Sequence, residues 1–246
     1  MLSVLELHEI AEADHRILNP FTDAHLMELA AVARVGPGTR VLDLACGKGE
    51  LLCRWAQELG STGVGVDLSP VFTAAARARA AELGVADRVA FVQGDAAAYR
   101  PEPGGFDIAA CIGATWIGGG VGGTIELLRA AVRPTGLVLV GEPFWREPPT
   151  AQARAAFGEP DPFTDLPGLL DRFEDAGADL VEMVLTDEHG WDRYVAAQWW
   201  ALRRWLDEHP GDPAAEQVRA FRDESRRAHL AHQRRYLGWG VFVLRP

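Results

Sequence analysis

The spacing of apolar residues alternates between strand and helix periods along the chain, which predicts an α/β fold. The run 41–44 is short and mostly apolar, as expected for a buried parallel strand. Small residues follow, and 50–60 then repeats its apolar residues at helical spacing up to a terminal glycine. The expected strands, some with the turn after them, are 41–44, 62–67, 87–96, 105–116, 137–141, 178–186 and 240–245. Alternating strands and helices indicate a doubly wound, Rossmann-like sheet of seven strands.

Two helical segments lie outside this alternation. The N-terminal segment has helical spacing on both sides of a break at Asn19-Pro20, which suggests a lid. About fifty residues separate the last two strands, and both 194–208 and 213–237 are periodic enough to be helices. The expected organisation is a single domain, 1–246, with an N-terminal helical cap (1–35), a cofactor-binding core (36–145) and a helical substrate cover (187–238).

Acidic residues mark the ends of the first three expected strands. Asp43 precedes a turn of small residues, 45–49, which brings bare backbone amides to a helix N-terminus. Asp67 ends the second strand, where nucleoside-binding α/β folds place a carboxylate for the ribose diol. Asp95 follows the third strand. The pattern predicts an adenosine site without specifying a reaction.

The spacing Asp43-x-Ala45-x-Gly47-x-Gly49 resembles motif I of the class I S-adenosylmethionine-dependent methyltransferases and differs from the G-x-G-x-x-G of dinucleotide folds. The turn 133–136 before the fifth strand is similar to the late motif of that family. Further pieces, including 113–117 and 190–194, resemble an uncharacterised bacterial group within it. The resemblance implies the cofactor S-adenosyl-L-methionine, with S-adenosyl-L-homocysteine as product, and disfavours an NAD oxidoreductase. The cofactor-binding residues it suggests are Arg16, Asp43, Ala45, Cys46, Gly47, Gly49, Asp67, Leu68, Asp95, Ala96, Cys111 and Gly113.

Candidate catalytic groups are few, because in-line methyl transfer mainly requires positioning, the exclusion of water and removal of one proton. Glu142 ends the fifth strand and is expected to face the ligand crevice. His15 lies in the bend of the lid. Arg16, beside it, can offer a planar fork to the carboxylate of the methionine tail, whereas Lys48 is expected to point to solvent. Each has a plainer interpretation as a solvated surface residue.

Aromatic residues concentrate in the C-terminal third, and most are expected to pack in the core. A subset is expected to line a pocket for a flat or cationic small molecule. The candidate substrate residues are Trp116, Trp145, Trp191, Tyr194, Trp199 and Tyr236. No metal site is expected, because Cys46, Cys53 and Cys111 show no paired spacing.

The composition limits the partners. A formal net charge of −11, without a basic stripe, argues against nucleic acid. No apolar run reaches transmembrane length, and three scattered cysteines favour a reducing compartment, so we expect a cytoplasmic protein. Its partner is expected to be a small molecule, and the oligomeric state is not predicted. Two further hypotheses stay open, namely a cofactor-binding protein without turnover and another group transfer or cyclisation with the same cofactor.

Overall fold

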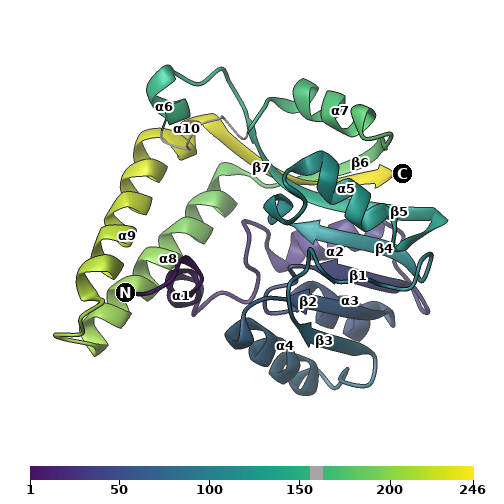
Figure 1. Cartoon of the computed structure of the whole chain (residues 1–246), viewed down its shortest axis with the longest axis horizontal. Helices are drawn as coiled ribbons and strands as arrows, with labels where there is room; N and C mark the ends of the chain where they lie inside the picture. Colours follow the sequence, from purple (N-terminus) through teal and green to yellow (C-terminus); the bar gives the residue numbers. More distant parts are fainter. Residues whose placement is uncertain (156–162) are drawn as a thin grey trace.

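The computed structural model describes residues 1–155 and 163–246, and its strands form a single seven-stranded sheet (Figure 1). The strand order is β3-β2-β1-β4-β5-β7-β6, with β7 antiparallel to both neighbours. The strands are β1 (Arg40–Leu44), β2 (Thr62–Asp67), β3 (Val89–Gln93), β4 (Phe106–Ile112), β5 (Val132–Trp145), β6 (Asp179–Leu185) and β7 (Leu237–Arg245). The order reverses between β1 and β4, so the ligand crevice of a doubly wound fold is expected there. The predicted fold class is confirmed.

Helices pack on both faces of the sheet, as the continuous apolar strands require. One core cluster joins the sheet to α2, α3 and α4, and a second joins it to α5 and α7. The helices are α1 (Val4–Ala11), α2 (Asp23–Val32), α3 (Glu50–Leu59), α4 (Pro70–Glu82), α5 (Val121–Arg129), α6 (Ala151–Ala155), α7 (Leu166–Asp175), α8 (Glu188–Glu208), α9 (Ala215–Ala228) and α10 (Arg234–Tyr236). A 3₁₀ turn spans Thr115–Gly118 and a π-helix spans His229–Gln233.

Strands β5 and β7 differ most from the expected boundaries, 137–141 and 240–245. β5 continues to Trp145 and β7 begins at Leu237, because these two residues pair with each other at the end of an antiparallel ladder. The helix expected over 213–237 is divided into α9, the π-helix and α10. α8 begins six residues before the expected 194, where Asp187 accepts a hydrogen bond from the Gly190 amide at 2.7 Å and caps the helix.

Helices α8 and α9 lie apart from the sheet, and α1 packs beside them (Figure 1). Leu7 and Ala11 of α1 are buried against Leu202 and Val218 of this pair. Leu2 and Ile10 are partly buried against the same cluster. The N-terminal helix is consequently joined both to the helical cover and, through the bend 12–22, to the core.

Candidate active site

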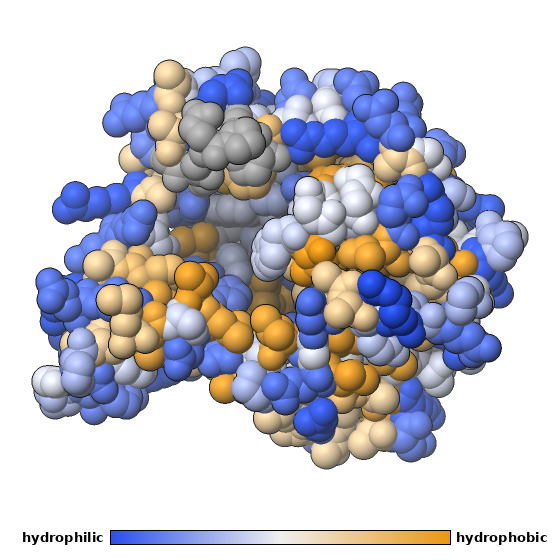
Figure 2. Space-filling view, in the orientation of Figure 1, coloured by the Kyte–Doolittle hydropathy of each residue, from blue (hydrophilic) through white to orange (hydrophobic). Residues whose placement is uncertain are grey.

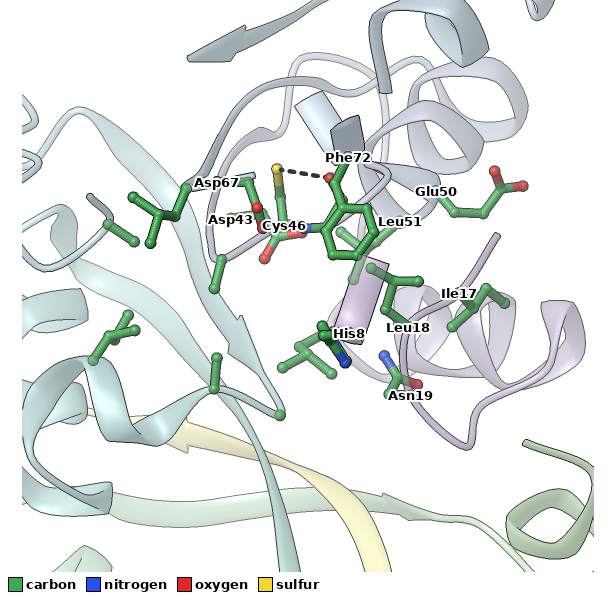
Figure 3. Close-up of a pocket in the computed structure, with 18 of the residues that line it drawn as sticks. His8, Ile17, Leu18, Asn19, Asp43, Cys46, Glu50, Leu51, Asp67 and Phe72 are labelled. Atoms are coloured by element: carbon green, nitrogen blue, oxygen red, sulfur yellow. Dashed lines mark hydrogen bonds between the residues drawn. The ribbon is translucent and has the colours of Figure 1, made fainter. Parts of the chain in front are cut away.

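A cavity of about 460 Å³ lies at the carboxyl ends of β1, β2, β3 and β4 (Figure 3). Its walls come from the turn after β1, the exits of the three other strands, helix α1 and the bend that follows α1. Ten of the predicted cofactor-binding residues line it, namely Arg16, Asp43, Ala45, Cys46, Gly47, Asp67, Leu68, Asp95, Ala96 and Gly113. Gly49 and Cys111 are not among the lining residues. Most of the predicted cofactor-binding residues therefore meet in one cavity, and their roles in binding stay predictions.

The turn after β1 approaches the cavity as bare main chain. Ala45, Gly47 and Gly49 all have positive φ, at 59°, 54° and 68°. Residues other than glycine rarely adopt this backbone conformation. A Cβ on Gly47 would lie 2.6 Å from Leu18 Cδ1, and one on Gly49 would lie 2.4 Å from the Phe91 ring. The absence of a Cβ at Gly47 lets Leu18 of the lid pack against the turn. Its absence at Gly49 lets α3 begin against Phe91 of β3.

Asp43 is a buried carboxyl group in the wall of this cavity. Burial, reinforced by the charge of Asp67, raises the pKa of Asp43 to about 8. Within the described part of the chain, no group donates a hydrogen bond to it. An uncompensated buried acid of this kind suits a cationic ligand group, which would restore its ionised form.

Asp67 is held in place by main-chain donors on both sides. Its Oδ2 accepts from the Gly47 amide at 2.8 Å, and its Oδ1 accepts from the Ser69 amide at 2.9 Å. Burial raises the pKa of Asp67, while these two hydrogen bonds oppose the shift. Asp95, by contrast, is exposed at the rim, where its Oδ1 accepts from the Ala97 amide. The two acids therefore lie at different depths of the same cavity.

The lid is fastened to the turn by Lys48. Its Nζ donates to the main-chain oxygens of Glu12, Ala13 and His15 at 2.7, 2.9 and 2.7 Å. The expectation that Lys48 points to solvent is wrong, because the bend after α1 presents three carbonyl groups within its reach. Arg16 lines the cavity, and its guanidinium forms an exposed ion pair with Glu82 at 3.3 Å.

Comparison with known proteins decides the family. A family model described as a methyltransferase domain matches residues 41–136. A solved S-adenosylmethionine-dependent methyltransferase from Geobacter sulfurreducens, in complex with S-adenosyl-L-homocysteine, is 50% identical, with a TM-score of 0.93 and complete coverage of both chains. The chain belongs to the S-adenosylmethionine-dependent methyltransferases. Its cofactor is S-adenosylmethionine, as predicted.

Two other relatives are nearly as similar to this methyltransferase. One from Thiobacillus denitrificans, also in complex with S-adenosyl-L-homocysteine, is 48% identical with a TM-score of 0.91, and the match covers 99% of this chain and 98% of that one. The uncharacterized protein YjhP of Escherichia coli is 47% identical over 99% of each chain. The likeness extends through the lid and the helical cover and is not confined to the cofactor core.

Two residues that no sequence pattern singled out are His8 of α1, in the wall of the methyltransferase cavity, and Glu12, which follows α1 and is buried against α8. His8 lines the cavity, and its ring meets the Phe72 ring edge-on at 5.7 Å. Glu12 is completely buried and accepts hydrogen bonds from Tyr194 Oη and Gln198 Nε2 of α8 at 2.6 and 2.7 Å. Leu5 and His8 lie three residues apart on one face of α1, a spacing that could have revealed His8 but not Glu12.

The two candidate catalytic groups lie near the cavity but are not among its lining residues. Glu142 does not end β5 as expected but lies within it, paired with Gly240, because the strand continues to Trp145. It is buried, its Oε2 accepts from the Thr115 hydroxyl at 2.8 Å, and burial raises the pKa of Glu142 to about 7. His15 Nδ1 lies 2.6 Å from Glu12 Oε2, and the His15 ring stacks at a tilt on Tyr194. His15 faces a groove between the bend and α8. Both roles remain predictions.

The candidate substrate residues fall into three places. Trp116 lines the cavity and is 74% exposed. Tyr194 and Trp199 are tied within the cover, through Glu12 and through a hydrogen bond from Trp199 Nε1 to Ser225 Oγ at 3.1 Å. Trp145 and Tyr236 are buried in a small cluster against which Trp191 packs. The surface is hollowed between the helical cover and the sheet (Figure 2), where a substrate could lie beside the cavity.

The described residues contain neither a cluster of metal ligands nor a helix that could span a membrane. Neither 1–155 nor 163–246 brings together three or more His, Cys, Asp or Glu side chains that could hold a metal ion. Of the helices in those ranges, none combines the length and apolar character that crossing a membrane requires. Metal independence stays a prediction. Burial raises the pKa values of the Cys46 and Cys111 thiols.

Proposed function

We propose that this methyltransferase methylates a small-molecule acceptor without a metal ion, and that the acceptor binds between the cofactor cavity and the helical cover. The observation that carries the proposal is the roof of the cavity. Leu5 and His8 of α1 and the bend 16–19 line the same cavity as Asp43 and Asp67, and in Figure 3 the labelled lid residues lie across the cavity from these acids. A roofed site favours an acceptor of modest size over a polymer, and the charge of −11 disfavours a nucleic acid.

The cavity residues fit the cofactor. The uncompensated Asp43 carboxyl and the bare main chain at Gly47, which both line the cavity, suit the methionine part with its ammonium group. Asp67 suits the ribose diol and Asp95 the adenine amino group. The bound cofactor supplies an electrophilic methyl group on a sulfonium, and the residues of this chain bind, orient and exclude water.

Removal of the acceptor proton is assigned to Glu142. Its pKa of about 7 gives a base that is substantially ionised near neutral pH, and the Thr115 hydroxyl fixes its orientation. Thr115 lies between the cavity-lining residues Ala114 and Trp116, so the hydrogen-bonded pair adjoins the cavity wall. His15, oriented by Glu12, is the alternative base. Replacing Glu142 by Gln is expected to lower kcat by about 10²-fold and to abolish the rise in rate through pH 7, whereas His15→Ala keeps that rise.

The test of the overall function is acceptor-dependent turnover. The protein is incubated with cofactor carrying a CD₃ group and with pools of small amines, phenols, thiols and carboxylic acids, and products are identified by mass. A product that gains one CD₃ group, formed equally with and without a chelator, supports the proposal. S-adenosylhomocysteine release that no acceptor stimulates would favour a binding protein. A product of altered structure without CD₃ would favour cyclisation, and activity lost to a chelator and restored by a divalent ion would contradict metal independence.

A further inference from the structure

His8 lies on α1, the first helix of the lid, and faces the residues that follow β2. Its neighbour Glu9 accepts a hydrogen bond from Ser69 Oγ at 2.5 Å, and the Ser69 amide donates to Asp67 at 2.9 Å. The His8 ring meets Phe72, four residues beyond Leu68, edge-on at 5.7 Å. Successive residues of α1 therefore dock on the turn that carries Asp67. In Figure 3, His8 lies with the lid residues on one side of the cavity and Asp67 lies on the other.

The imidazole of His8 has no hydrogen-bond partner among the described residues, although it lines the cavity. Other side chains of the lid are engaged: Arg16 pairs with Glu82, and Asn19 Oδ1 accepts from the Phe21 amide. His8 is also close enough for its charge to oppose the rise in the pKa of Asp67. A polar ring held in a ligand cavity without a protein partner is a group that awaits a ligand.

The hydrogen-bonding chemistry of a ribose identifies what such a group would do opposite Asp67. A hydroxyl that donates its proton to a carboxylate still has lone pairs, and these are satisfied only by a donor. Asp67 can only accept when ionised, and the Gly47 and Ser69 amides beside it already donate to Asp67 itself. The donor must therefore come from another element that faces this position.

We propose that His8 is a cofactor-binding residue, whose ring N–H donates to a ribose hydroxyl of S-adenosylmethionine on the side opposite Asp67. The proposal rests on the assignment of Asp67 to the ribose. It makes α1 part of the cofactor site, so the nucleoside is held by the β2 exit from one side and by the lid from the other. Contact with Phe72 fixes the plane of the His8 ring and reduces the rotamer freedom lost on binding.

The test separates hydrogen bonding from packing. His8→Phe keeps an aromatic ring against Phe72 but removes the donor, and His8→Asn keeps a donor but removes the ring. Calorimetric titration with S-adenosylhomocysteine should show about tenfold weaker binding for His8→Phe and no more than about threefold for His8→Asn, the scale of one buried hydrogen bond. His189→Ala is the matched control, because His189 is exposed and lies outside the cavity, and its affinity should equal that of the wild type.

Deoxy analogues locate the contact. Wild type and His8→Phe are titrated with the 2′-deoxy and 3′-deoxy forms of S-adenosylhomocysteine. The analogue that lacks the hydroxyl bound by His8 should have the same affinity for both proteins, because neither can form that hydrogen bond with it. An affinity of His8→Phe within twofold of wild type would overturn the proposal, as would an equal loss for both analogues and the parent ligand. Thermal unfolding of each variant establishes that it is folded. Should Asp67→Ala bind the parent ligand as tightly as wild type, the ribose assignment itself would fail, which is a distinguishable result.

Discussion

The floor of the cavity and the helical cover are held by different kinds of atoms. At the floor, main-chain groups dominate: positive-φ turn residues shape the surface, and the Gly47 and Ser69 amides orient Asp67. In the cover, side chains make the attachments, since Glu12 joins α1 to Tyr194 and Gln198 of α8, and Trp199 bonds to Ser225 of α9. Substitutions in the cover should therefore lower the free energy of unfolding, whereas substitutions at the floor should weaken the binding of the ligand.

The largest expected effect is in the cover, for Glu12→Ala. Removal of this buried carboxylate leaves the amide of Gln198 without its acceptor, and the hydroxyl of Tyr194 keeps only the Leu18 carbonyl oxygen at 3.2 Å, so we expect a loss of about 3 kcal/mol in the free energy of unfolding. Urea denaturation measures it. Glu28→Ala, an exposed change on α2, is the control and should shift stability by less than about 0.5 kcal/mol. A loss for Glu12→Ala no larger than that of the control would refute the description of Glu12 as the joint of the cover.

The same residue predicts a dependence of stability on pH. Burial alone would raise the pKa of Glu12, but hydrogen bonds from His15 and Tyr194 outweigh it, and the pKa lies below the ordinary 4.5. The stabilisation is therefore complete above pH 4.5 and is lost as the pH falls through the lower value of the folded protein. Denaturation at a series of acid pH values should show this loss in wild type and a weaker one in Glu12→Gln.

The next effect is at the floor, for Asp67→Ala. Loss of a charged hydrogen bond to the ribose is expected to cost roughly 1.5–3 kcal/mol, or about tenfold to 150-fold in affinity for S-adenosylhomocysteine. Trp199→Phe, in the cover, should leave that affinity unchanged and lower stability by about 1 kcal/mol through loss of its bond to Ser225. Calorimetry and urea denaturation on both variants measure the contrast. An equal affinity loss in both would break the comparison between floor and cover.

A smaller effect is expected from the protonation of Asp43. Its pKa of about 8 means that it is mostly protonated at neutral pH, while an ammonium ligand group requires the ionised form. Binding of S-adenosylhomocysteine should thus release up to one proton, and affinity should increase as the pH rises from about 6 toward 8. Titrations in buffers with different ionisation enthalpies count the protons. Asp43→Asn should release none, and proton release that persists in this variant would assign it to another group.

The smallest effect concerns Arg16 at the edge of the lid. Its ion pair with Glu82 is exposed on both sides, so Arg16→Ala should leave folding stability unchanged within error. If Arg16 also binds the methionine carboxylate, the variant should bind S-adenosylhomocysteine a few-fold more weakly, whereas Glu82→Ala should not. Hydrogen exchange of residues 14–21 with and without ligand measures closure of the lid. Equal exchange in both states, with wild-type affinity in Arg16→Ala, would make the bend only a structural corner.

The floor was predictable from sequence because its signals are local. A strand, an acid at its end and a turn of small residues are consecutive, so spacing alone brought Asp43, Asp67 and Asp95 to one edge of the sheet. The ladder between β5 and β7 was less accessible, because it depends on pairing Trp145 with Leu237, far apart in the chain. For that reason β7 begins at Leu237 and not at the expected residue 240.

The cover and lid depended on contacts that no local pattern announces. The burial of Glu12 follows from two residues of α8 more than 180 positions away, so a glutamate near a helix end seemed an ordinary surface residue. The orientation expected for Lys48, toward solvent, was wrong because its acceptors are main-chain carbonyl groups. The sequence does not mark such acceptors, since every residue has one. The aromatic residues were correctly recognised as a concentration. Periodicity could not separate Trp116, at the cavity, from Trp145, in the interior.

The hydrogen bonds from Lys48 to the main chain of the lid bear on how the acceptor specificity of this enzyme could be altered. Carbonyl oxygens are present in every residue, so the anchoring of Ala13 and His15 does not depend on their side chains. The side chains of Asp14 and His15 also hold the bend, through Arg204 and Glu12, whereas position 13 can vary while the bend keeps its place. A library randomised at position 13 should therefore retain a folded lid.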